Sequence, residues 1–108
     1  MKRRTILTTA AAALALSGLT TTAHAADPIK IGAVAAKTGP LAGGTAVTHW
    51  PNIRLWAHQV NERGGLMVGG EKRMVDIIEY DDQTNPGETI KAVQRLATQD
   101  EADFIVAP

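Results

Sequence analysis

Two threonines, a pair of glycines and a tryptophan follow the first apolar segment of the chain. Thr38 and Thr45 carry hydroxyl groups that can donate hydrogen bonds, and the backbone N–H groups expected to be exposed at Gly43 and Gly44 can do the same. Trp50 offers an apolar wall for the remainder of a ligand. These residue types suit the binding of a small polar molecule with an anionic group, and we assign no catalytic residue among them.

Structural roles are the alternatives for the same residues. Thr38, together with Gly39 and Pro40, has the composition of a turn. Trp50 directly precedes Pro51, a residue that suits the first turn of a helix, so Trp50 can equally pack at a helix start. The sequence leaves ligand contact and structural support open at both positions.

Other polar residues give no reason to expect a metal or a nucleotide. Asp81 and Asp82 lie at the end of an expected strand without a nearby histidine or third carboxylate, which is typical of solvated or capping groups. His49 and His58 lack a third zinc ligand. Residues 32–38 end in Lys-Thr but lack the glycines of a phosphate-binding loop, and no dinucleotide motif opens the first helix. We therefore expect no cofactor.

The first 25 residues predict a cleavable export signal. Residues 2–4 are basic, residues 6–19 are mostly apolar, and residues 23–25 read Ala-His-Ala, which suits a cleavage site. The apolar segment is shorter than the roughly 20 residues of a membrane-spanning helix, so a retained anchor is the less favoured alternative. Two adjacent arginines leave the general secretory and the twin-arginine routes both open.

Removal of this signal makes the rest of the chain mildly acidic. The chain has 11 basic and 11 acidic residues, and the signal takes three of the basic ones, which leaves eight against eleven. This balance gives no reason to expect a nucleic acid or an anionic membrane surface as a partner. Cysteine is absent, so stability has to come from apolar packing instead of disulfides.

The elements that must position these residues alternate between strands and helices. Apolar runs at residues 29–34, 74–80 and 104–107 predict three buried strands. Apolar residues at helical spacing predict one helix that begins at Pro51 and another that begins at Pro86. The alternation predicts an α/β fold, a parallel sheet with flanking helices and strand order 2-1-3.

Turn and capping residues refine this arrangement. We expect a loop over residues 36–49, a turn at residues 69–70, and Asn85 as the helix cap, with Glu88 three residues later. Trp56 is expected in the core, because it shares a helix face with other apolar residues. The apolar face of the second helix is expected to comprise Ile90, Val93, Leu96 and Ala97.

Four segments carry a resemblance to a known family. They read IKIGAVAAKTGPLA, VNERGGL, DDQTNPGETIKAV and DFIVAP in chain order. In this order and spacing they resemble motifs of the type I periplasmic binding proteins, in the leucine/isoleucine/valine- and amide-binding branch of ABC importers. Residues 26–108 would then form part of the amino-terminal lobe of a longer protein. The sequence predicts three strands and no helix after the last one, as expected for part of a larger sheet. A complete miniature domain is the alternative.

The resemblance implies the function of a substrate-binding protein, not of an enzyme. Members have two hinged lobes that close on an amino acid or a similar small solute in the periplasm and deliver it to an ABC permease. In relatives an aromatic residue a few positions after the Thr-Gly-Pro touches the ligand. Here that position falls on Gly43 and Gly44, so the expected contact moves to Trp50. An extracellular ligand-sensing domain of the same fold is the alternative.

Physical reasoning places the expected ligand at one edge of the sheet. In open parallel sheets, ligands bind beyond the carboxyl ends of the strands, where the strand order reverses. With order 2-1-3 this point lies between the first and third strands. The loop at residues 37–45 follows the first strand, so it is expected to reach the ligand.

Overall fold

The structure, a computed structural model, describes residues 25–108. The predicted export signal therefore lies almost entirely outside the described residues. Within them the elements alternate as expected, apart from one additional helix and one hairpin.

A three-stranded parallel sheet forms the centre of the fold. It consists of β1 (Ile29–Ala35), β4 (Val75–Asp81) and β5 (Phe104–Val106), in the order β4-β1-β5. Both neighbours of β1 run parallel to it, with Ile31 paired to Ile77 on one side and to Phe104 on the other. Six of the seven residues of β1 are buried, as expected for a central parallel strand. The predicted α/β class and the strand order 2-1-3 are confirmed.

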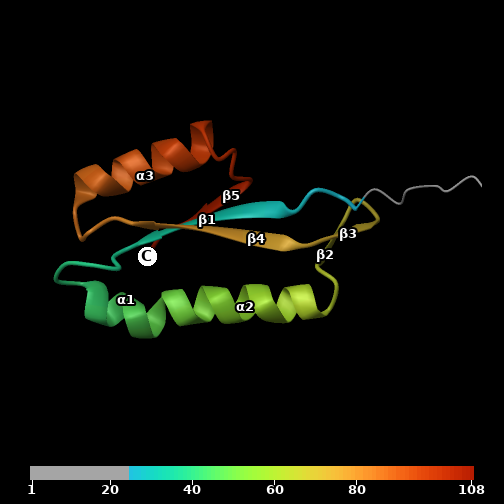
Figure 1. The fold of residues 1–108 in the computed structure, drawn as a ribbon, viewed down its shortest axis with the longest axis horizontal. Coiled ribbons are helices and arrows are strands. Elements are labelled where there is room, and N and C mark those ends of the chain that lie inside the picture. The colour runs from blue at the N-terminus through green and yellow to red at the C-terminus, as the bar shows by residue number, and fades with distance from the viewer. Residues whose placement is uncertain (1–24) are drawn as a thin grey trace, which may run out of the picture.

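Helices cover the two faces of this sheet (Figure 1). The helices α1 (Ala42–Thr48) and α2 (Trp50–Glu62) lie on one side, and α3 (Pro86–Thr98) lies on the other. Pro86 stands in the first turn of α3, and the Asn85 side chain caps this helix by accepting a hydrogen bond from the Gly87 N–H at 2.8 Å. The predicted helix start is confirmed.

Alternate residues of β1 pack against different helices, because successive side chains of a strand point to opposite faces. On the α2 side, Ile29 and Ile31 pack with Ala57 and Val60. On the α3 side, Val34 packs with Leu96, and both are fully buried. The core is therefore divided by the sheet into two layers.

Gly32 allows α3 to approach the sheet closely. A Cβ atom at this position would lie 2.5 Å from Leu96 Cδ1, a distance that real Cβ contacts do not show. Leu96 therefore fills the space that a side chain at residue 32 would need. This contact sets the spacing between α3 and β1.

Three parts of the sequence-based prediction are wrong or incomplete. The expected loop over residues 36–49 contains α1, which runs almost directly into α2. A hairpin of β2 (Leu66–Val68) and β3 (Glu71–Arg73) precedes β4, with the predicted Gly69-Gly70 turn between its strands at positive φ. Trp56 is 41 % exposed and not in the core, because the sheet surface that it faces carries no further element among the described residues.

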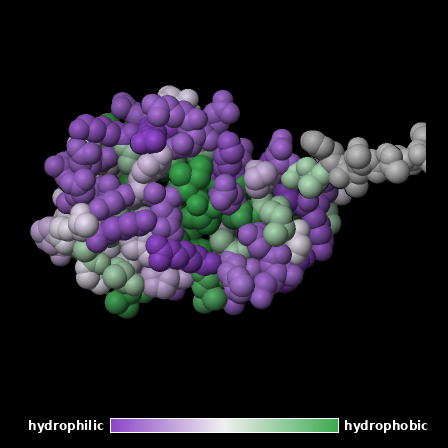
Figure 2. Space-filling model, viewed as in Figure 1, coloured by the Kyte–Doolittle hydropathy of each residue, from purple (hydrophilic) through white to green (hydrophobic). Residues whose placement is uncertain are grey.

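The apolar face of α3 was predicted only in part. Leu96 is buried and Val93 packs beside it, but Ile90 is 60 % exposed and Ala97 is also exposed. The face that meets the sheet is narrower than the periodicity suggests. Figure 2 shows the same division at the surface: the two helical layers are largely hydrophilic in this view, and hydrophobic residues lie between them.

Candidate functional site

The loops after β1 and β4 lie together at the carboxyl edge of the sheet (Figure 1). All three strands of the sheet are parallel, so their carboxyl ends share this edge. The β1 loop, residues 36–41, leads into α1, and the β4 loop, residues 82–85, leads into α3. This is the edge at which the ligand is expected.

Asp81 joins these two loops. Its Oδ1 atom accepts hydrogen bonds from the backbone N–H groups of Lys37, Thr38 and Gln83 at 2.7, 3.2 and 2.8 Å. Its Oδ2 atom accepts from the Thr38 hydroxyl at 2.7 Å. Three of these bonds come from Lys37 and Thr38 of the β1 loop, so this carboxylate holds the loop against the end of β4.

Thr84 adds a second connection between the same loops. Its Oγ1 atom accepts from the Leu41 N–H at 3.2 Å, and its hydroxyl donates to the Thr38 carbonyl oxygen at 3.4 Å. Gly39 has a φ of +88°, and a Cβ there would lie 2.7 Å from the Gln83 carbonyl oxygen. A larger residue at position 39 would force the two loops apart.

The hydrogen bonds to Asp81 favour its ionised form. The Thr38 hydroxyl, followed by the Lys37 N–H, lowers the pKa of Asp81 to about 2, because these donors stabilise the negative charge. Asp81 is thus a carboxylate at neutral pH. The sequence placed Asp81 among solvated or capping groups, and its structural role in joining two loops was not foreseen.

Thr45 also uses its hydroxyl inside the protein. Its Oγ1 atom lies within hydrogen-bond distance of the Ala36 and Ala42 carbonyl oxygens. A carbonyl oxygen only accepts, so the Thr45 hydroxyl is the donor in this contact. Gly43 and Gly44 lie in α1 and are exposed, with open space where a Cβ would stand. The Gly44 N–H, which was predicted as an exposed donor, donates instead to the Leu41 carbonyl oxygen at 3.1 Å, because the chain turns into α1 here.

Trp50 lies in the interior and supports the β1 loop from below. It is 4 % exposed and packs against Ala33 and Ala35. Its indole N–H donates to the Ala36 carbonyl oxygen at 3.1 Å. The Lys37 ammonium lies 4.7 Å from the centre of the Trp50 ring, at a distance typical of a cation–π contact. This packing corresponds to the structural alternative considered for Trp50.

An ion-pair cluster around Glu79 lies beside Trp50. Arg54 donates through Nε and Nη2 to the two Glu79 carboxylate oxygens at 2.6 and 2.7 Å, and the Lys37 ammonium lies 2.7 Å from Oε2. The hydrogen bonds from Arg54 lower the pKa of Glu79 to about 2, with a further contribution from Lys37 and with burial acting in the opposite direction. The cluster connects α2, β4 and the β1 loop.

A cavity of about 490 Å³ opens at the carboxyl edge, between α1 and the start of α3. Its walls are mainly apolar, and they include Leu41 from the β1 loop and Ile90 from α3. The Asp82 side chain at its base is buried and accepts from the Thr84 N–H and the Thr89 hydroxyl at 2.9 and 3.2 Å. The cavity is lined by Ala36, Leu41, Thr45, Asp82, Thr84, Asn85, Pro86, Thr89, Ile90 and Pro108.

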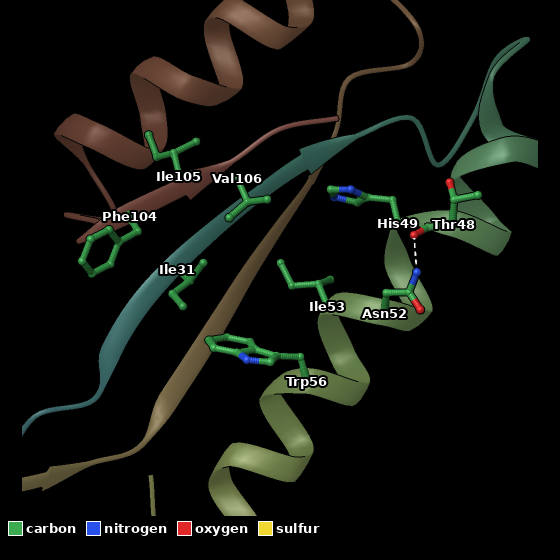
Figure 3. A pocket seen from close by; sticks show the side chains of 9 residues that line it. All are labelled: Ile31, Thr48, His49, Asn52, Ile53, Trp56, Phe104, Ile105 and Val106. Atoms are coloured by element: carbon green, nitrogen blue, oxygen red, sulfur yellow. Dashed lines mark hydrogen bonds between the residues drawn. The ribbon is translucent and has the colours of Figure 1, made fainter. Parts of the chain in front are cut away.

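A second apolar groove, of about 560 Å³, lies between α2 and β5. Figure 3 shows Ile31, Phe104 and Val106 of the sheet opposite Ile53 and Trp56 of α2. We regard it as an uncovered part of the sheet surface, because it runs along the sheet face instead of opening at the carboxyl edge.

Among residues 25–108, no group of three histidine, cysteine, aspartate or glutamate side chains could hold a metal ion. Asp81 and Asp82 use their carboxylates to fix loops, as described above. In the same part of the chain, no helix combines the length and hydrophobicity needed to cross a membrane.

Comparison with known proteins identifies the family. The family model described as periplasmic binding protein matches residues 28–108. The chain belongs to this family. Among solved structures, it is similar to the branched-chain amino acid transporter substrate binding protein LivJ from Streptococcus pneumoniae, in complex with isoleucine, with a TM-score of 0.65 and 27% identity. The match covers 75% of this chain and 22% of LivJ.

These similarities confirm a type I periplasmic binding protein of the leucine/isoleucine/valine branch, with the fold of the first part of one lobe. The family and LivJ are binding proteins and not enzymes, and the family is that of periplasmic proteins. The chain spans less than a quarter of the length of LivJ.

Proposed function

We propose that the protein is the substrate-binding component of an ABC importer, which captures a branched-chain amino acid or a similar small solute in the periplasm and delivers it to a membrane permease. The observation that carries this proposal is the similarity in fold and sequence to LivJ, whose structure contains isoleucine. The predicted signal at residues 1–25 would export the chain.

The carboxyl edge of the sheet supports this proposal. The β1 loop is held by hydrogen bonds that it donates to Asp81 and Thr84, so its shape exists before a ligand arrives. A preformed loop loses little conformational entropy on binding. The mainly apolar cavity beside it suits an aliphatic side chain better than a charged one.

The proposed contacts divide into two groups. Thr38, Gly43 and Gly44 are exposed at this edge and are proposed to meet the solute directly. Thr45 and Trp50, which are bonded to the Ala36 carbonyl oxygen, are proposed to act from behind the loop by supporting its shape.

Calorimetric titration of the protein in its native length tests this function. We expect saturable binding of isoleucine, leucine or valine at one site, with micromolar or tighter affinity, and no binding of glutamate, whose second carboxylate does not suit an apolar cavity. Absence of binding for every branched-chain amino acid would contradict the proposal. Solute binding by the purified protein, together with loss of solute uptake in a strain that lacks the protein, would agree with it.

A further inference from the structure

The segment between the predicted export signal and β1 is held by the hairpin of β2 and β3. Arg73 of β3 donates through Nε to the Asp27 carbonyl oxygen at 2.8 Å and through Nη2 to the Pro28 carbonyl oxygen at 3.4 Å. Figure 1 shows the hairpin beside the residues that lead into β1. These two bonds, named the Arg73 clamp, fix the backbone just after the predicted cleavage bond between Ala25 and Ala26.

The Arg73 clamp depends on the folded position of the hairpin. Leu66 is paired with Arg73 across the hairpin and packs against the core cluster that contains Ile29. The Ile29 N–H donates to the Met74 carbonyl oxygen at 2.8 Å, directly after β3. Arg73 and Asp27 are 46 positions apart in the sequence, so only these long-range contacts bring them together. An unfolded chain has no such clamp.

Little chain lies between the predicted cleavage bond and the core. Three residues, Ala26, Asp27 and Pro28, separate this bond from Ile29, which is 5 % exposed. Ala26 is partly buried and lines a pocket of about 570 Å³ together with Val68 of β2. Proline fixes its own φ and biases the preceding residue toward an extended conformation, so this segment has few other shapes. It is too short and too stiff to leave the hairpin while the Arg73 clamp is closed.

We propose that the Arg73 clamp protects the predicted cleavage bond in the folded chain, so that the signal is removed fastest before the hairpin docks on residues 27–28. Hydrolysis adds one water molecule across the Ala25–Ala26 bond, which leaves a carboxylate on Ala25 and an ammonium group on Ala26. A peptidase has to bind the backbone on both sides of this bond, and that backbone is bonded to Arg73. The inference rests on the predicted signal, which is part of the proposed function, and adds when the signal can be removed.

The physical basis is local opening. Proteolysis of a folded chain follows the population of the opened state when opening and closing are fast compared with cleavage. Opening of residues 25–28 gives up hydrogen bonds from a charged donor, which are stronger than those from a neutral one. The Arg73 clamp therefore lowers the population that a peptidase can cleave.

Cleavage of the precursor in its native length by purified signal peptidase tests this role. A synthetic peptide of residues 18–30 carries the same bond without the hairpin, and we expect it to be cleaved faster than the folded precursor. In Arg73→Gln we expect the folded precursor to be cleaved roughly threefold to tenfold faster than the wild type, because the charged donor is lost. Arg73→Lys keeps the charge but not the two-pronged geometry, so its rate should lie between the two.

Two control variants separate the clamp from other effects. Lys72 is the neighbour of Arg73 on β3, and its ammonium donates to the Arg63 carbonyl oxygen at 3.1 Å, away from residues 25–28. Cleavage of Lys72→Gln should differ less than about twofold from the wild type. Gly32→Ala strains the contact with α3 and lowers global stability, but it leaves the clamp in place, so its cleavage rate should also stay close to that of the wild type. Circular dichroism shows that each precursor is folded.

The outcomes distinguish this inference from the proposed solute binding. Equal rates for wild type and Arg73→Gln, or a folded precursor cleaved as fast as the peptide, would overturn the inference. Equal acceleration in Gly32→Ala and Arg73→Gln would also overturn it, because cleavage would then follow global unfolding. Cleavage of the peptide at a different bond would overturn the predicted signal boundary together with the clamp. Each of these results leaves isoleucine binding by the processed protein as a separate test of the proposed function.

Discussion

At the scale of single residues, the candidate site depends on contacts between residues that lie far apart in the sequence. Thr38 and Asp81 are 43 positions apart, and the hydroxyl of one is bonded to the carboxylate of the other. Residue types alone identified Thr38 as a polar group in the β1 loop, and the structure places its hydroxyl against Asp81. They could not give the direction of its hydrogen, because that depends on a partner from another strand.

Gly32 gives a prediction at the same scale. We expect Gly32→Ala to lower the free energy of unfolding by about 1 to 3 kcal/mol, because overpacking forces Leu96 out of its position. The ideal Cβ position lies 2.5 Å from Leu96 Cδ1, and α3 would have to move. Chemical denaturation monitored by circular dichroism measures the change.

Gly43→Ala is the matched control for this substitution. Gly43 lies in α1 with open space around the Cβ position, so alanine should be neutral or stabilise the protein by about 0.5 to 1 kcal/mol. The double variant Gly32→Ala with Leu96→Val should lose less stability than the sum of the two single variants. Additive losses would show that the Leu96 contact is not the cause.

At the scale of elements, local signals predicted most of the fold. β1 is a continuous apolar run, and α3 is preceded by the cap residue Asn85 and begins at Pro86. These local sequence signals were sufficient to predict both elements. The helix α1 was missed because its sequence, AGGTAVT, contains two glycines and two threonines. Its support includes bonds from the Thr45 hydroxyl to the Ala36 carbonyl and from the Thr48 hydroxyl to the Gly44 carbonyl.

The ion pairs of Glu79 predict how low pH changes the stability of the contacts between α2, β4 and the β1 loop. The folded-state pKa of Glu79, about 2, lies below its ordinary value of 4.5. Its stabilising contribution is therefore complete above pH 4.5 and is lost as the pH falls from about 4.5 toward 2. Because Arg54 is largely exposed, solvent screens the pair, and we expect a contribution of about 1 kcal/mol.

Glu79→Gln should therefore show a shallower fall in the free energy of unfolding between pH 5 and about pH 2 than the wild type. The remaining slope would include Asp81, whose pKa is also lowered to about 2. Arg54→Gln should remove much of the same pH dependence, and the double variant should add little. An unchanged slope in Glu79→Gln would refute this account of the cluster.

At the scale of the whole molecule, periodicity identified a helix face but not what covers it. Trp56 has helical spacing with Ile53 and Val60, which suggested the core, but it lies on the open groove between α2 and β5. Which residues meet a sheet surface depends on the full set of elements. The match to LivJ covers only 22% of that chain, so most of the surfaces of such a protein have no counterpart in residues 25–108.

The small share of LivJ that the match covers leads to a prediction about residues 26–108 as an isolated chain. Closure around a solute requires contacts from two lobes, and residues 26–108 correspond to the first part of one lobe. We expect the isolated chain to bind isoleucine more weakly than micromolar affinity in calorimetry, even where circular dichroism and proton NMR show that it is folded. Saturable binding by the folded fragment would contradict this prediction, because it would mean that the β1 loop and the adjacent cavity suffice for both ends of the solute.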